Sequence, residues 1–70
     1  MVYLNFIPRT NVDANEFKAL IDGSDFFAEW HSEGYFSFED DEDTVDELEY
    51  HLQELISATG INGHFETETA

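Results

Sequence analysis

The sequence predicts an α+β fold in which strands and helices pack as two layers. Three observations indicate it: apolar residues alternate over residues 2–7, helix-start signals precede two segments with helical apolar spacing, and a glycine-containing break separates two aromatic stretches between them. Seventy residues with 41% apolar and 16% aromatic composition suit one folded domain and are too apolar for an acidic disordered tail. We expect this domain to span residues 1–67 and residues 68–70 to form a frayed tail.

Residues 2–7 have the two-residue period of a strand. The two faces of this strand should carry Val2, Leu4 and Phe6 on one side and Tyr3, Asn5 and Ile7 on the other. Pro8 should end the strand because it has no amide hydrogen to donate to a neighbour.

A helix is predicted directly after this strand. Asp13 and Glu16 have the spacing of a capping box, and Val12 and Phe17 have that of a hydrophobic staple. Gly23 is well placed to end the helix.

Residues 25–40 allow two interpretations. Either the first helix continues through Gly23, or FFAEWH and YFSFED form a hairpin around the loop 32–34, which ends in Gly34. We favour the hairpin, because aromatic residues prefer strands and a glycine inside a helix costs about 1 kcal/mol.

The second helix should begin at Thr44, which forms a T-x-x-E capping box with Glu47, and should end at Gly60. A last strand should follow in INGHFETE, with Ile61 and Phe65 facing inward. The order β-α-β-β-α-β predicts a ferredoxin-like arrangement, with a four-stranded antiparallel sheet and both helices on one of its faces.

Charge is the most unusual property of the chain. Seventeen Asp and Glu residues face two basic residues, Arg9 and Lys18, which gives a net charge of −15 at pH 7. A compact chain of this length is about 28 Å across, and fifteen charges correspond to about 25 Å of duplex DNA. Per unit length, the protein and DNA are therefore similarly charged.

Seven of the nine residues from Glu39 to Glu47 are carboxylates. The helix dipole accounts for Asp43, Asp46 and Glu47, which precede or occupy the first turn of the second helix. It does not account for residues 39–42, which repel one another without a basic partner. Adaptation to high salt is a second explanation, although the many large apolar side chains argue against it.

Metal, cofactor and catalytic sites are not predicted. His31 and His64 should lie on opposite edges of the sheet, and His51 on the flank of the second helix, so they should not share an ion. The acidic run lacks the glycine of a calcium-binding loop. Nucleophile-elbow and phosphate-binding glycine signatures are also lacking, so we expect a protein that is not an enzyme.

The sheet face without helices should be aromatic, as in domains that stack RNA bases. A net charge of −15 opposes contact with phosphates, so we expect no direct nucleic-acid binding. The face is better suited to a protein contact. One option is a homodimer through Tyr3, Ile7, Phe27 and Tyr35.

These patterns indicate a binding protein that imitates the phosphate backbone and blocks the basic nucleic-acid-binding surface of a partner. The expected contact residues are Glu39, Asp40, Asp41, Glu42, Asp43, Asp46, Glu47, Tyr50 and Glu54. In size and charge the chain resembles the small acidic proteins with which phages block restriction, CRISPR, repair or transcription machinery, without sharing motifs with them. The alternative is a small interaction or dimerisation module whose acidity serves solubility or salt tolerance. Without a signal-like or membrane-spanning stretch, we expect a cytoplasmic protein with no membrane contact.

Overall fold

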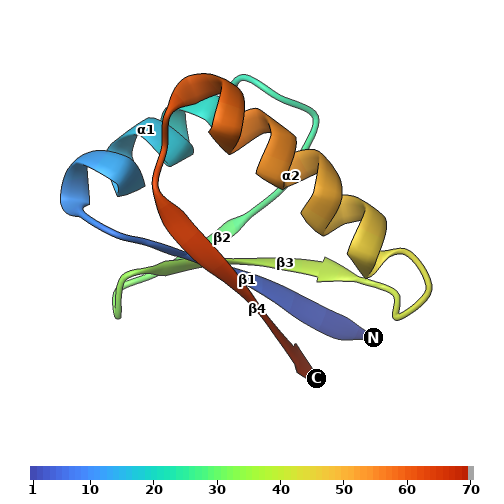
Figure 1. Cartoon of the computed structure of the whole chain (residues 1–70). Helices are drawn as coiled ribbons and strands as arrows, with labels where there is room; N and C mark the ends of the chain where they lie inside the picture. Colours follow the sequence, from blue (N-terminus) through green and yellow to red (C-terminus); the bar gives the residue numbers. More distant parts are fainter. Residues whose placement is uncertain (70) are drawn as a thin grey trace.

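The computed structural model describes residues 1–69 and contains four strands and two helices within them. In chain order these are β1 (Val2–Pro8), α1 (Asn11–Asp22), β2 (Glu29–His31), β3 (Tyr35–Asp40), α2 (Val45–Thr59) and β4 (Gly63–Thr69). The strands form one sheet in the order β2-β3-β1-β4, and all neighbours are antiparallel. Both helices lie on the same face of this sheet (Figure 1). The predicted two-layer α+β sandwich, consistent with a ferredoxin-like arrangement, is confirmed.

The core lies between the sheet and the helices and is dominated by phenylalanine. Val2, Leu4 and Phe6 of β1 face inward and are buried, as their alternation predicts. Phe17 of α1 is fully buried and stacks on Phe6 with ring centroids 4.2 Å apart. Because burial of one such side chain contributes about 1.5–3 kcal/mol, this aromatic cluster fixes the position of α1 on the sheet. Among residues 1–69, no helix is long and apolar enough to cross a membrane.

The start of α1 differs from the prediction. Thr10, rather than Asp13, is the N-cap, and its hydroxyl accepts a hydrogen bond from the Asp13 amide. The Asp13 carboxylate instead accepts hydrogen bonds from the backbone amide of Asn62 at 3.0 Å and from the Thr10 hydroxyl at 2.8 Å. These bonds lower the pKa of Asp13, the Asn62 amide having the largest effect. Val12 is exposed, so the predicted staple with Phe17 does not form. The helix ends before Gly23, as predicted.

The hairpin interpretation of residues 25–40 is confirmed, with a shorter first strand than expected. His31 pairs with Tyr35 across the loop 32–34, and Gly34 adopts a φ of 107°, which glycine tolerates at no steric cost. Strand β2 has only three residues. Phe27 lies before it and is 88% exposed.

The boundaries of α2 agree with the prediction, but its cap does not. Thr44 is the N-cap without accepting a hydrogen bond from the helix, so the T-x-x-E capping box is absent. At the other end Gly60 adopts the left-handed conformation. Strand β4 then runs to Thr69, so Glu68 and Thr69 pair with β1 where a frayed tail 68–70 was expected; Ala70 lies outside the described residues. Ile61 is buried in the loop before β4.

Candidate functional site

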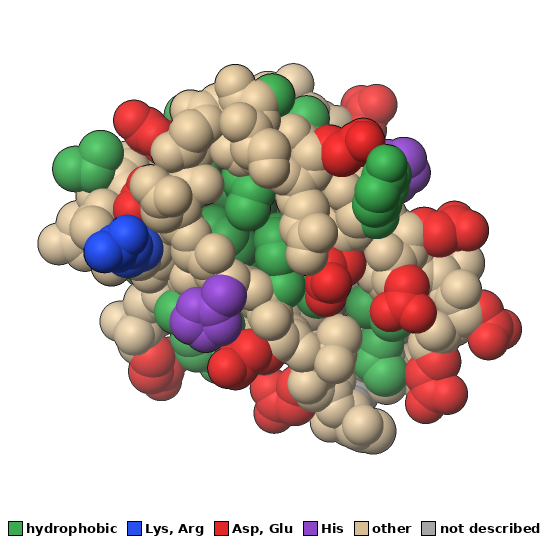
Figure 2. Space-filling view, in the orientation of Figure 1, with side chains coloured by type: hydrophobic (Ala, Val, Ile, Leu, Met, Phe, Trp, Pro, Cys, Tyr) green, Lys and Arg blue, Asp and Glu red, His purple; other side chains and the backbone are tan. Residues whose placement is uncertain are grey.

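The acidic run Glu39–Glu47 forms the end of β3, the loop to α2 and the first turn of α2. We call residues 41–43 of this run the acidic loop. Its carboxylates are exposed, as are those of Asp46 and Glu47 in the helix that follows. Figure 2 shows many Asp and Glu side chains at this end of the molecule and others elsewhere on the same side, whereas the basic atoms visible in that view lie at the opposite end, near the start of α1. The charge of the protein is therefore unevenly distributed.

Asp40 holds the acidic loop in place. One of its carboxylate oxygens accepts hydrogen bonds from the Asp41 amide at 2.8 Å and from the Thr44 hydroxyl at 2.7 Å. The carbonyl oxygen of Asp41 accepts from the amides of Thr44 and Val45. Val45 is buried and anchors the first turn of α2 in the core. The loop carboxylates are thus presented by an ordered turn, with Asp40 in a supporting position.

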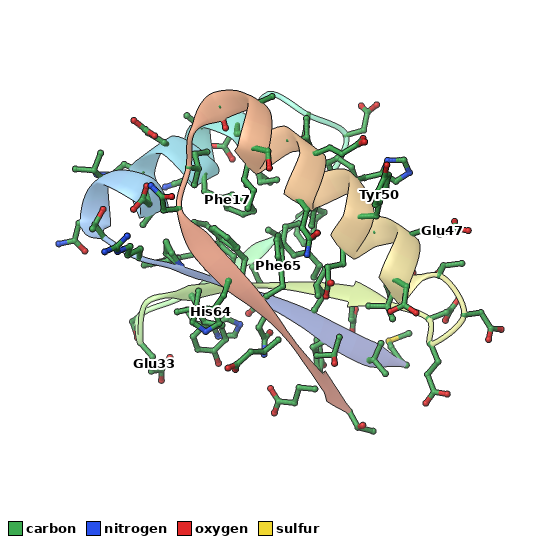
Figure 3. The ribbon with its side chains drawn as sticks, in the orientation of Figure 1. Phe17, Glu33, Glu47, Tyr50, His64 and Phe65 are labelled. Atoms are coloured by element: carbon green, nitrogen blue, oxygen red, sulfur yellow. The ribbon has the colours of Figure 1, made fainter. Side chains whose placement is uncertain are left out.

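Two further predicted residues extend this surface along α2. Glu47, Tyr50 and Glu54 follow one another at three- and four-residue spacing and so share one side of the helix. Tyr50 is 60% exposed, and Figure 3 shows Glu47 and Tyr50 projecting outward from α2. The Glu54 carboxylate raises the pKa of Tyr50, first through a hydrogen bond from the phenol and then through its charge.

The structure does not place all nine predicted residues on one face. Glu39 pairs with Tyr3 of β1 and therefore points to the sheet face without helices, which we call the open face. Asp40, the next residue, points to the helix side, where it contacts Thr44. The predicted row of carboxylates consequently bends around the end of the sheet at this point.

The open face carries an acidic surface of its own, part of which was not predicted. Strand pairing aligns Glu68 with Tyr3 and Glu66 with Asn5, while Glu29 pairs with Ser37. The carboxylates of the open face are those of Glu29, Glu39, Glu66 and Glu68. Alternation in HFETET places Glu66 and Glu68 on the opposite side of the strand from the inward Phe65. This pattern could have predicted their position on the open face. Neither basic residue lies on the paired strand positions of this face.

A shallow hollow of about 260 Å³ lies in the open face between these carboxylates. It is lined by Tyr3, Asn5, Glu29, His31, Tyr35, Ser37 and Glu68. Tyr3 and Tyr35, which were predicted for the open face, therefore line it together with Asn5, which was predicted for the same side of the first strand. Phe27 borders a smaller adjoining hollow with Tyr3 and Glu39, whereas Ile7 lies towards the other end, beside Arg9 and His64.

His31 and His64 occupy strands at opposite edges of the sheet. His64 contacts Glu66 at 3.5 Å, and Figure 3 shows it on the side of the sheet away from α2. Within residues 1–69, no group of three or more His, Cys, Asp or Glu side chains is arranged to hold a metal ion. Comparisons with protein-family models, curated proteins and solved structures gave no match.

Proposed function

We propose that this protein is a non-enzymatic inhibitor that occupies the basic nucleic-acid-binding surface of a partner protein. The observation that supports the proposal is the ordered, exposed run of carboxylates at one end of the sheet, which contains no lysine or arginine from Glu39 to Glu54. A groove lined by Lys and Arg would attract this surface by the same electrostatic forces with which it attracts phosphates.

The dimensions of the molecule are consistent with such mimicry. Its longest extent is 30 Å and its net charge is −15. A duplex of that length carries about 18 charges at one per 1.7 Å. The Cβ atoms of residues three or four apart on α2 are about 5–6 Å apart, similar in scale to neighbouring phosphates on one strand. The protein can therefore present a comparable charge in a comparable space, in the manner of small acidic phage inhibitors of host defence, repair or transcription.

The proposal is tested with two variants that remove the same charge from different places. The first replaces Asp41, Glu42, Asp43 and Glu47 by Asn or Gln. The second replaces Glu16, Asp22, Asp25 and Glu33 in the same way, so each loses two Asp and two Glu. None of these eight carboxylates makes a hydrogen bond among the described residues, and Figure 3 places Glu33 at the far end of the molecule from Glu47. Asp40 and Thr44 are kept because they order the acidic loop.

Competition with labelled duplex DNA for a panel of basic DNA-binding proteins gives the readout. The wild-type protein should displace DNA from at least one of them, and less effectively as salt rises. Four exposed ion pairs at about 0.2–1 kcal/mol each predict that the first variant binds between about fourfold and several hundredfold more weakly than the second. Equal binding by the two variants would show that the acidic run is an ordinary solvated surface.

A second candidate function is a small protein-interaction or dimerisation module whose acidity serves solubility or salt tolerance. The 88% exposure of Phe27 favours it, because a side chain of this size beside the open face offers apolar area to a partner. On this alternative the wild-type protein displaces no DNA from the panel.

A further inference from the structure

The interior of the hollow in the open face is formed by buried polar side chains that make hydrogen bonds. Its floor is formed by Asn5 and Ser37, each only 8% exposed. The Asn5 amide donates to the Glu68 carboxylate at 3.1 Å, and the Ser37 hydroxyl lies 2.6 Å from Nε2 of His31. These contacts hold one carboxylate and one aromatic ring in fixed positions around the hollow.

Aromatic rings form the walls. His31 and Tyr35 stack with centroids 4.4 Å apart and ring planes 14° from parallel. Tyr3 lies on the neighbouring strand β1 and also lines the hollow. Stacked rings of this kind offer a π-face to a cation or to a planar group.

The charge around the hollow selects the ligand. Glu29 and Glu68 line it, Glu39 and Glu66 lie on adjacent open-face positions, and no lysine or arginine lines it. Its volume of about 260 Å³ is below the range of about 300–1,000 Å³ that holds a drug-sized ligand, so it suits a single side-chain head group. Guanidinium is planar, stacks on aromatic rings and pairs with carboxylates through two hydrogen bonds, whereas ammonium is a compact point charge.

We propose that this hollow binds the guanidinium group of an arginine side chain on a partner protein, between the aromatic rings of Tyr3 and Tyr35 and the carboxylates of Glu29 and Glu68. The hollow is separate from the acidic loop, and the inference does not rest on mimicry of nucleic acid.

The test is an NMR titration of the ¹⁵N-labelled protein with Nα-acetyl-arginine amide, with Nα-acetyl-lysine amide and Nα-acetyl-norleucine amide as comparisons. The arginine probe should give saturable shifts at the Asn5 side-chain amide and at the backbone amides of Tyr35 and Ser37. The lysine probe should bind more weakly, and the neutral norleucine probe should not shift these signals.

Variants separate this site from general attraction to an acidic protein. Loss of a cation–π contact or of an exposed ion pair corresponds to a change of about two- to fivefold in affinity, which we expect for Tyr35→Leu and for Glu29→Gln. Glu42→Gln removes the same charge from the acidic loop and should leave the affinity unchanged. Tyr35→Phe keeps the ring and should retain binding even if Tyr35→Leu disturbs the hairpin. Shifts spread evenly over both acidic surfaces, or equal effects of Glu29→Gln and Glu42→Gln, would overturn the proposal.

Discussion

Gly63 should be among the least tolerant positions of the chain, although it lies on the surface at the start of β4. A methyl group added there would lie 2.5 Å from Cζ of Phe6 and 2.6 Å from the carbonyl oxygen of Ile7. The Phe6 ring has little room to move, since it is fully buried and packs against Phe17 at 4.2 Å and Phe65 at 4.9 Å. Gly63→Ala should therefore destabilise the fold by about 1–3 kcal/mol, the usual effect of overpacking.

Gly23→Ala is the matched control. Its methyl group would meet the Ala19 carbonyl oxygen at an ordinary 3.6 Å, and the backbone φ of −89° suits alanine. We expect this variant to be as stable as the wild type or more stable by about 0.4–1 kcal/mol. In thermal unfolding, Gly63→Ala should lower Tm by about 4–24 °C, whereas Gly23→Ala should not lower it.

The comparison also tests the open face. Gly63 pairs with Pro8, and this register places Glu66 and Glu68 opposite Asn5 and Tyr3. A shift of one residue would turn both carboxylates to the helix side. Equal stability of the two glycine variants would mean that β4 does not begin against Phe6, and the acidic open face would lose its structural basis.

Two further predictions concern charge. At a net charge of −15 the carboxylates repel one another and destabilise the fold, so Tm should rise with sodium chloride from about 0.01 M to 1 M. Over this range the Debye length falls from about 30 Å to 3 Å. A flat trend in thermal scans would contradict this repulsion. Asp13 has a lowered pKa in the folded state, so its stabilising effect is fully present above the ordinary value of 3.8 and is lost as the pH falls through the folded value. Urea unfolding should accordingly find Asp13→Asn less stable than the wild type at pH 7, with the difference narrowing below pH 3.8, and a constant difference would refute this linkage.

The sequence predicted the elements of the fold because its local signals agree with its tertiary packing. Alternation in residues 2–7 identified the inward face of β1, and glycines marked the ends of both helices. The hairpin followed from Gly34, whose positive φ the three-residue loop requires. Each of these signals is read from neighbouring residues, so no knowledge of distant contacts was needed.

The predicted helix caps were wrong because their side chains bind partners that the local sequence does not specify. Asp13 has the chemistry of an N-cap, but its carboxylate bonds to the amide of Asn62, 49 residues away, and Thr10 caps the helix instead. Thr44 donates to Asp40 rather than accepting from its own helix. When a polar side chain has several possible hydrogen-bond partners, the tertiary structure decides which one it binds. The spacing of residues in the sequence does not contain this information.

The candidate site, too, was predictable from the sequence only in part. The acidic run was apparent as a run, but its bend at Glu39 depends on strand alternation carried through the β1–β3 pairing. The open-face hollow depends on contacts between residues still farther apart in the sequence, because its lining residues come from all four strands. Glu68 lines it only through the register between the first and last strands.

Salt distinguishes the two kinds of contact that the open face can make. A homodimer through Tyr3, Ile7, Phe27 and Tyr35 would bring together two copies of a face that carries Glu29, Glu39, Glu66 and Glu68 and has no lysine or arginine at its paired strand positions. Screening weakens that repulsion, so self-association should strengthen as salt rises. Binding of an arginine side chain rests on attraction between opposite charges and should weaken over the same range. Sedimentation at 0.05 M and 1 M sodium chloride, compared with the arginine titration at both concentrations, should therefore show opposite trends. A dimer that dissociates at high salt would require a lysine or arginine contact that the paired strand positions of the open face do not supply, and the assignment of the homodimer to this face would then be wrong.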